Sequence, residues 1–149
     1  FNSEKRTRFS CKKFPARNKW LDVEFILDIE GRPTPRPRFN GKMAYMPKPY
    51  NDYQKALVNL IKAQNLSDGD FCRIHMVFHF AYPKSTPKYR RIDGLPLRQK
   101  FDGDNLAKGV MDALEKAGMV EDDRQFYQVR VDKYRTTETS KIHIKLWEC

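Results

Sequence analysis

The sequence has few cysteines and no long apolar run. Its three cysteines are Cys11, Cys72 and Cys149, which are far apart and form no CxxC pair. This spacing indicates neither a zinc site nor a disulfide framework, and it fits a reducing, cytoplasmic setting. No run approaches the roughly 20 apolar residues of a membrane-spanning helix, so we expect no membrane partner. Residues 1–20 carry seven Lys or Arg and no apolar stretch, so no signal peptide is visible.

Acidic residues are the minority charge. The chain of 149 residues has 29 Lys and Arg against 19 Asp and Glu, which gives a net charge of +10. Such an excess implies a polyanionic partner, with nucleic acid as the first candidate and an anionic membrane surface as the second. Charge alone is equally compatible with a basic surface that is only solvated. With 40% hydrophobic residues, the chain has enough apolar matter for one domain with one core.

The hydrophobic pattern predicts an α+β fold. We divide the chain into a basic N-terminal arm, residues 1–20, and one folded domain, residues 21–149. Asn51 is the predicted N-cap of a first helix, and Gly118 the glycine that ends a second. We expect a mixed sheet of four or five strands, with the last two strands paired antiparallel through the turn between them. The spacing predicts strands over 21–30, 42–46, 71–82, 125–134 and 141–147, and main helices over 51–65 and 104–117.

Carboxylates gather around the second predicted helix. Asp102 and Asp104 flank a glycine just before it, and an acidic run that includes Asp122 and Asp123 follows it. A helix of about fourteen residues is about 21 Å long, so the two acidic groups meet only if the strand after Asp123 doubles back along the helix. At about 100° per residue, one polar face of the helix carries Asp104, Lys108, Asp112 and Glu115.

This grouping has two interpretations. Clustered carboxylates repel one another unless a cation binds them, and oxygen ligands without Cys or His favour Mg²⁺ or Mn²⁺ over zinc. In phosphodiester hydrolysis the cation lowers the pKa of a bound water, and Lys108 is placed to stabilise the developing negative charge. Alternatively, Asp102 or Asp104 only caps the helix, although capping does not account for Asp122 and Asp123. Spacing alone supports both interpretations.

Basic residues flank this segment on both sides. The proline-rich loop over residues 31–38 holds three arginines, and the loop over residues 83–100 holds many more cations. Proline cannot donate to a strand ladder, so the first stretch is an extended loop. We predict phosphate contacts for Arg32, Arg36, Arg38, Lys84, Lys88, Arg90, Arg91, Arg98 and Lys100.

The acidic segment resembles the RusA family of Holliday-junction resolvases, found in bacteria and their phages. The family motif is Asp-x-Asp-Asn-Leu, a lysine on the same helix, Asp-Ala-Leu, a glycine, and an acidic pair followed by a polar residue and Gln. An early proline- and arginine-rich loop, here residues 31–39, also resembles the family. The matching residues are Asp102, Asp104, Asn105, Leu106, Lys108, Asp112, Ala113, Leu114, Gly118, Asp122, Asp123 and Gln125.

The resemblance covers residues 21–147 and implies a small α+β homodimer that binds four-way DNA junctions. It implies a magnesium-dependent endodeoxyribonuclease, with Mn²⁺ as a possible substitute. Asp102, Asp104 and Asp123 would be catalytic and hold the metal, assisted by Lys108. An intracellular, bacterial or phage-encoded protein is expected. The alternatives are a non-cleaving DNA-binding subunit of the same fold and a module that docks an acidic protein. The presence of every motif acid and of Lys108 argues against the non-cleaving subunit.

Overall fold

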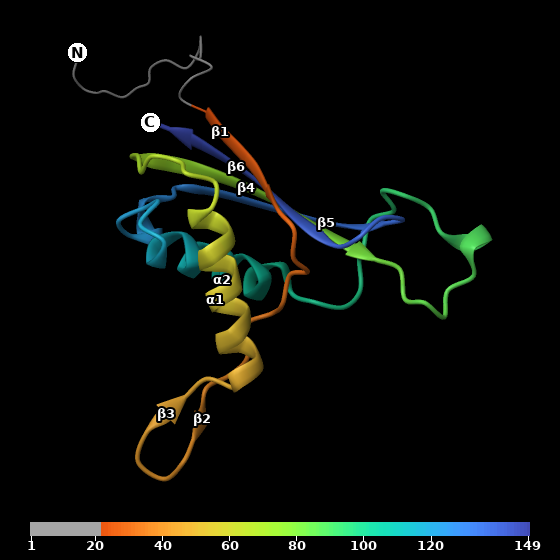
Figure 1. Cartoon of the computed structure of the whole chain (residues 1–149), viewed down its shortest axis with the longest axis horizontal. Helices are drawn as coiled ribbons and strands as arrows, with labels where there is room; N and C mark the ends of the chain where they lie inside the picture. Colours follow the sequence, from red (N-terminus) through yellow and green to blue (C-terminus); the bar gives the residue numbers. More distant parts are fainter. Residues whose placement is uncertain (1–21) are drawn as a thin grey trace.

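A four-stranded sheet forms the centre of the protein. The computed structural model describes residues 22–149, so the predicted basic arm lies outside the described residues. Helices α1 (Lys48–Lys62) and α2 (Gly103–Lys116) lie on the same face of the sheet (Figure 1). The strands lie in the order β1 (Asp22–Leu27), β6 (Lys141–Glu148), β4 (Phe71–Ala81) and β5 (Gln128–Thr136). The predicted α+β fold with a mixed sheet and two main helices is confirmed.

The pairing predicted for the last two strands is wrong. Strand β5 pairs with β4 in parallel, whereas β6 crosses over β4 and pairs antiparallel with both β4 and β1. The reason lies in burial. The inward residues of β6, Ile142, Ile144 and Leu146, are fully buried, which requires a strand on each side. Along β5 only Thr136 is buried, so this strand is suited to the edge of the sheet.

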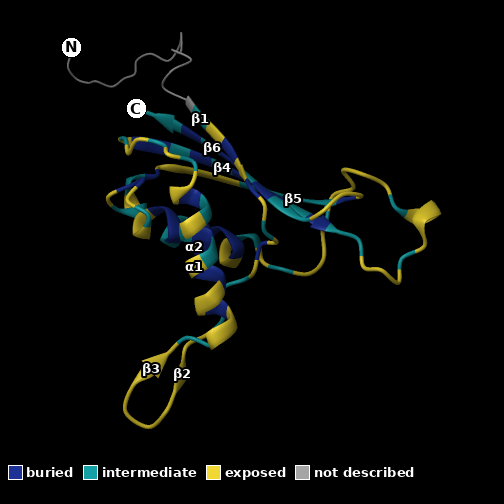
Figure 2. Cartoon of the chain, in the orientation of Figure 1, coloured by how far each residue is buried: buried dark blue, intermediate teal, exposed yellow. Residues whose placement is uncertain are grey.

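Alternation along β4 supplies much of the core. Its residues at even positions face the helices, and helical spacing turns the apolar stripes of α1 and α2 toward them. Figure 2 shows the buried residues gathered between the helices and the sheet. The fully buried side chains of this layer include Ile74, Met76, Phe78, Leu57, Ile61, Leu106, Val110 and Leu114.

The helix ends follow local chemistry. Helix α2 has Asp102 at its N-cap position and is followed by Gly118, which has a φ of 84°. The Met119 backbone N–H donates to the Leu114 carbonyl at 3.0 Å, which completes the predicted glycine-terminated end. Helix α1 begins three residues earlier than predicted, because Pro47 at the N-cap and Pro49 in the first turn fix a helical entrance without losing a needed N–H. Asn51 is therefore not the N-cap.

Two of the cysteines form a disulfide, which corrects the expectation of none. Cys72, near the start of β4, is bonded to Cys149, and their Cα atoms lie 5.6 Å apart. The two cysteines are 77 residues apart in the sequence, so no local spacing pattern indicated that they pair. It arises because β4 and β6 are antiparallel, so the start of one lies beside the end of the other. The cysteine pattern therefore no longer argues for a reducing setting.

Four shorter elements complete residues 22–149. Strands β2 (Arg38–Phe39) and β3 (Ala44–Tyr45) form a small hairpin around Asn40 and Gly41. Single 3-10 turns form at η3 (Lys88–Arg90) and η4 (Asp123–Gln125). Within these described residues, no helix has the length and apolar character needed to cross a membrane.

Gly31 lies where the loop after β1 passes over the core. A Cβ atom there would lie 2.5 Å from Cδ2 of the Phe78 ring and 3.5 Å from Leu106. Gly31→Ala should therefore lower the free energy of unfolding by about 1–3 kcal/mol, as overpacking does. Urea denaturation measures the change. Gly103→Ala is the control, because its Cβ would meet only Val131, at an ordinary 3.6 Å. Equal stability of Gly31→Ala and the parent would contradict this packing.

Candidate active site

Asp102 and Asp104 lie exposed at the N-terminus of α2. Asp102 occupies the N-cap position, yet its side chain makes no capping hydrogen bond. The carboxylate is therefore not used to satisfy the backbone of the helix. The interpretation of Asp102 as a plain cap fails on this point, and its charge is free for a ligand.

The backbone just before Asp102 is held in an unusual conformation. Lys100 and Phe101 both have positive φ, 62° and 50°, although neither is glycine. Such conformations cost energy and gather at functional sites. The ammonium of Lys133 on β5 donates to the carbonyls of Phe101, at 2.7 Å, and Lys100, at 3.3 Å. Strand β5 thus fixes the turn that presents Asp102.

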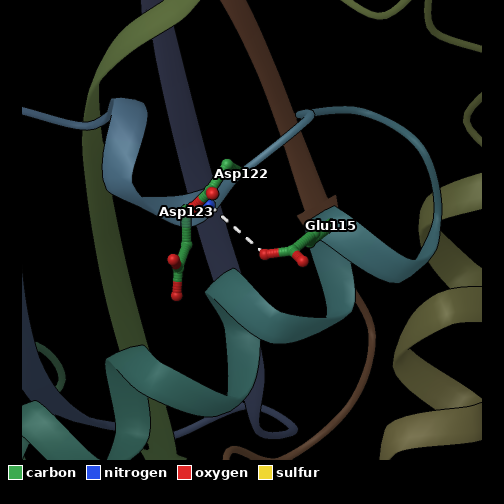
Figure 3. Close-up of side chains that lie close together, drawn as sticks. All are labelled: Glu115, Asp122 and Asp123. Atoms are coloured by element: carbon green, nitrogen blue, oxygen red, sulfur yellow. Dashed lines mark hydrogen bonds between the residues drawn. The ribbon is translucent and has the colours of Figure 1, made fainter.

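Asp123 lies beside the other end of α2. Its backbone N–H donates to Oε1 of Glu115 at 3.3 Å. Carboxylate oxygens of Glu115, Asp122 and Asp123 all lie within 4.8 Å of one another (Figure 3). Partial burial raises the pKa of the Asp123 carboxyl, and so do the hydrogen bond with Asp122 and the charges of Glu115 and Asp112. An accumulation of negative charge of this kind is relieved by a cation.

The structure does not bring the three predicted acids into one cluster. Strand β5 does double back along α2, but Asp123 precedes it and stays at the last turn of the helix. About 16 Å of helix rise separates Asp104 from Glu115. In residues 22–149, no group of three ligands at the 4.8 Å spacing includes Asp102 or Asp104. The acids form two groups, one at each end of the exposed face of α2.

Lys108 lies between these two groups. Its ammonium is 4.0 Å from Oδ2 of Asp112, and its side chain is 59% exposed. A contact this long and this exposed contributes little to stability. The lysine is therefore available to a ligand that lies along the helix.

Glu115 was not among the predicted site residues. The available signal was its helical phase, which it shares with Asp104 and Lys108. That phase did not distinguish it from an ordinary solvent-facing glutamate. Only the position of η4 places a second acid beside it.

Asp122 and Gln125 hold η4 in place. Asp122 accepts hydrogen bonds from the Arg124 backbone N–H and from Nη2 of its guanidinium, both at 2.8 Å. These bonds lower the pKa of Asp122 to about 2. Gln125 accepts from the Asp122 backbone N–H at 3.3 Å and donates to the Phe71 carbonyl at 2.8 Å. The motif glutamine therefore ties the acidic turn to β4.

The predicted DNA-contacting cations divide into two kinds. The guanidinium of Arg91 donates to the carbonyl of Thr86 at 3.0 Å and lies 3.4 Å from that of Pro83, so it braces its own loop. The Tyr82 hydroxyl forms hydrogen bonds with the backbone N–H and carbonyl of Ile92 in the same loop. The remaining predicted cations are exposed, from the loop after β1 to β2 and on the loop between β4 and α2: Arg32, Arg36, Arg38, Lys84, Lys88, Arg90, Arg98 and Lys100.

A carboxylate-lined helix in a small, basic α+β domain suits a nuclease that acts on phosphodiesters. The sequence profile of the family described as Endodeoxyribonuclease RusA matches residues 28–147, so the chain belongs to the RusA endodeoxyribonuclease family. It is 27% identical over 127 residues to a crossover junction endodeoxyribonuclease of Enterobacteria phage HK97, across 85% of this chain and 95% of that protein. The predicted family is confirmed, and membership supports nuclease activity.

Asp122 and Asp123 should affect stability in opposite directions. The pKa of Asp122 is lowered to about 2, so its ionised form stabilises the fold above its ordinary pKa, and this is lost as the pH falls toward about 2. The pKa of Asp123 is raised, so its ionised form destabilises the fold at neutral pH. At about pH 7 in chelator, Asp122→Ala should lower Tm and Asp123→Ala should raise it.

Thermal melts followed by circular dichroism measure both differences. At about pH 3 both should shrink, because Asp123 is protonated there and Asp122 approaches its own titration. A lower Tm for Asp123→Ala at neutral pH would contradict the repulsion described for this turn.

Proposed function

We propose that the protein is a magnesium-dependent endodeoxyribonuclease that resolves four-way junctions or other branched DNA. Family membership and the similarity to a phage crossover junction endodeoxyribonuclease support this proposal. The observation that carries it is the exposed face of α2. The Asp102 carboxylate at its N-terminus makes no capping bond, and beside its other end partial burial, together with neighbouring acids, raises the pKa of Asp123. Carboxylates without a structural role, on a chain of net charge +10, suit metal-assisted cleavage of a polyanion.

The donor chemistry fits magnesium, with manganese as a substitute. The acids around α2 and η4 offer carboxylate oxygens and neither Cys nor His, which disfavours zinc. We assign Asp102, Asp104 and Asp123 as metal-holding residues, with Asp102 and Asp104 at the N-terminal end of α2 and Asp123, beside Glu115, at the other end. When bound, the ion would lower the pKa of a water molecule and neutralise charge on the phosphate. Magnesium needs only one or two carboxylates, so each end of α2 offers enough.

The chain itself positions the DNA. Exposed cations of the loop before β2, and Lys100 beside Asp102, would hold the phosphates on either side of α2. Lys108 would stabilise negative charge that develops on the phosphate as the bond breaks. We also propose a homodimer, because a four-way junction offers two symmetric phosphodiesters to two matching sites.

Cleavage should require the three aspartates and a divalent cation. We expect Asp102→Asn, Asp104→Asn and Asp123→Asn each to cut labelled four-way junctions about a hundredfold or more slowly. Binding should be kept or strengthened, because each variant removes a negative charge near phosphate. Chelator should abolish cutting by the parent and leave binding intact. Gel assays with junction, linear duplex and single strand measure both properties.

Two further variants sharpen this test. Asp68→Asn, which changes an exposed acid outside α2 and η4, should behave as the parent. Glu115→Gln should weaken Mn²⁺ binding if Asp123 holds the ion together with its neighbour. Binding without cutting by the parent in Mg²⁺ or Mn²⁺ would favour a non-cleaving subunit. Near-normal cutting by all three Asp→Asn variants would contradict the assignment.

Lys108 separates a catalytic role from a structural one. Lys108→Ala should lower the single-turnover rate on pre-bound junction by about a hundredfold or more if its charge acts on the phosphate. Stability should change by only a few tenths of a kcal/mol, because the pair with Asp112 is loose and alanine is a good helix former. Lys108→Arg should restore little, because a planar fork does not replace a compact ammonium. Lys62→Ala on α1 is the control. An unchanged cleavage rate in Lys108→Ala would show that Lys108 is an ordinary surface residue without a catalytic role.

A further inference from the structure

The β2–β3 hairpin projects away from the sheet and from both helices (Figure 1). Every residue from Arg36 to Tyr45 is exposed, as the unbroken exposed colour of the hairpin in Figure 2 shows. Each strand has only two residues, and hairpins of this kind have little stability without a packed face. Because the hairpin is exposed and does not pack into the core, core packing does not explain why it carries large apolar side chains.

Those side chains are unusually open to solvent. Phe39 is 77% exposed, Met43 is 67% exposed and Tyr45 is 45% exposed. Phe39 is paired across the hairpin with Ala44, which leaves the face of the ring uncovered on that side. Exposed apolar groups gathered in this way mark a contact surface.

The hairpin is also basic throughout. From Gly31 to Tyr50 the sequence contains no Asp or Glu, whereas it contains Arg36, Arg38 and Lys42. An acidic polymer with exposed aromatic faces complements this combination. Unpaired nucleic-acid bases provide such faces, and they stack on aromatic side chains whatever their sequence.

The turn of the hairpin is well formed. The Asn40 backbone N–H donates to the Met43 carbonyl at 3.2 Å, and the Met43 backbone N–H donates to Oδ1 of Asn40 at 3.2 Å. The tip therefore presents Phe39 and Met43 in a defined turn rather than in a loose loop. A preformed turn reduces the ordering cost of binding.

The base of the hairpin is attached to the helix that carries the acids. Thr34 donates to the Asn105 carbonyl through its backbone N–H at 3.2 Å and its hydroxyl at 3.0 Å. Thr34 Oγ1 also lies 3.1 Å from the Tyr50 hydroxyl on α1. Asn105 follows Asp104 directly, so the hairpin starts beside the N-terminal acidic group of α2. The hairpin is therefore anchored beside the candidate site.

We propose that the β2–β3 hairpin is a base-stacking element that places Phe39, flanked by Met43, against unpaired bases at the branch point of DNA. The inference rests on the proposed function and adds to it the element that distinguishes branched from linear DNA. Linear duplex offers the arginines of the hairpin its phosphates but offers Phe39 no open base. The arginines of the hairpin therefore contribute to the affinity for both substrates. Phe39 contributes to the selectivity for branched DNA.

Binding assays in chelator test this without any need for cleavage. Phe39→Ala should weaken binding to a four-way junction by about five- to a hundredfold, the range of one lost base–aromatic stack. Binding to linear duplex should change less than about twofold, because the charges stay in place. Phe39→Trp should retain the preference for the junction. Tyr127→Ala, which removes an aromatic ring that is 72% exposed outside the hairpin, should leave both affinities unchanged.

Photocrosslinking identifies the contact directly. A junction with 5-iodouracil at the branch point should crosslink to the tryptic peptides on either side of Lys42, and the same base within an arm should not. Equal junction affinity of Phe39→Ala and the parent, equal losses on junction and duplex, or crosslinks only outside the hairpin would each overturn the inference. If the parent cuts junctions and Phe39→Ala keeps the preference for junctions over linear duplex, only the assignment of the hairpin is wrong. If the parent has no preference for branched DNA, the proposed function is wrong as well.

Discussion

The candidate site depends on how α2 packs against the sheet. Leu106, Val110 and Leu114 are completely buried, and helical geometry leaves only one way to achieve this. With that stripe turned to β4, the opposite stripe, which carries Asp104 and Lys108, must face solvent. The charges are therefore placed by the apolar residues behind them. A helix held by its buried face can also keep repelling acids together on the other face, because core packing offsets the repulsion.

The two ends of α2 are positioned by different means. At the N-terminus, Lys133 of β5 bonds the carbonyls of the turn before Asp102, where two residues hold positive φ. At the C-terminus, Gln125 bonds the Phe71 carbonyl and so attaches η4 to β4. Strand β5 runs between these points as the edge of the sheet. The order of the sheet therefore fixes the separation between the two acidic groups.

The sequence predicted the residues that depend on local pattern. Strand β4 was predicted from its alternation, and α2 was predicted from its amphipathic spacing and the glycine that follows it. The order of the acids along the chain was sufficient to predict the family. Pairing between distant strands carries no local signal, so the position of β6 between β1 and β4 was missed. The Cys72–Cys149 disulfide was missed for the same reason. The proximity of Glu115 to Asp123 depends on the turn at η4, which spacing along the chain does not determine.

The charge distribution links the basic loops to the acidic helix. With a net charge of +10 the chain attracts polyanions, and exposed arginines lie on the loop before β2. The carboxylates on α2 and η4 oppose that attraction where the DNA would approach most closely. Removing them would favour binding, so their presence is a cost to affinity. A divalent cation bound to these carboxylates would reverse this local effect, because its charge would neutralise theirs. Under the proposed function, a basic chain with an acidic helix face would therefore hold DNA through its loops and bring it to α2 only when the ion is bound.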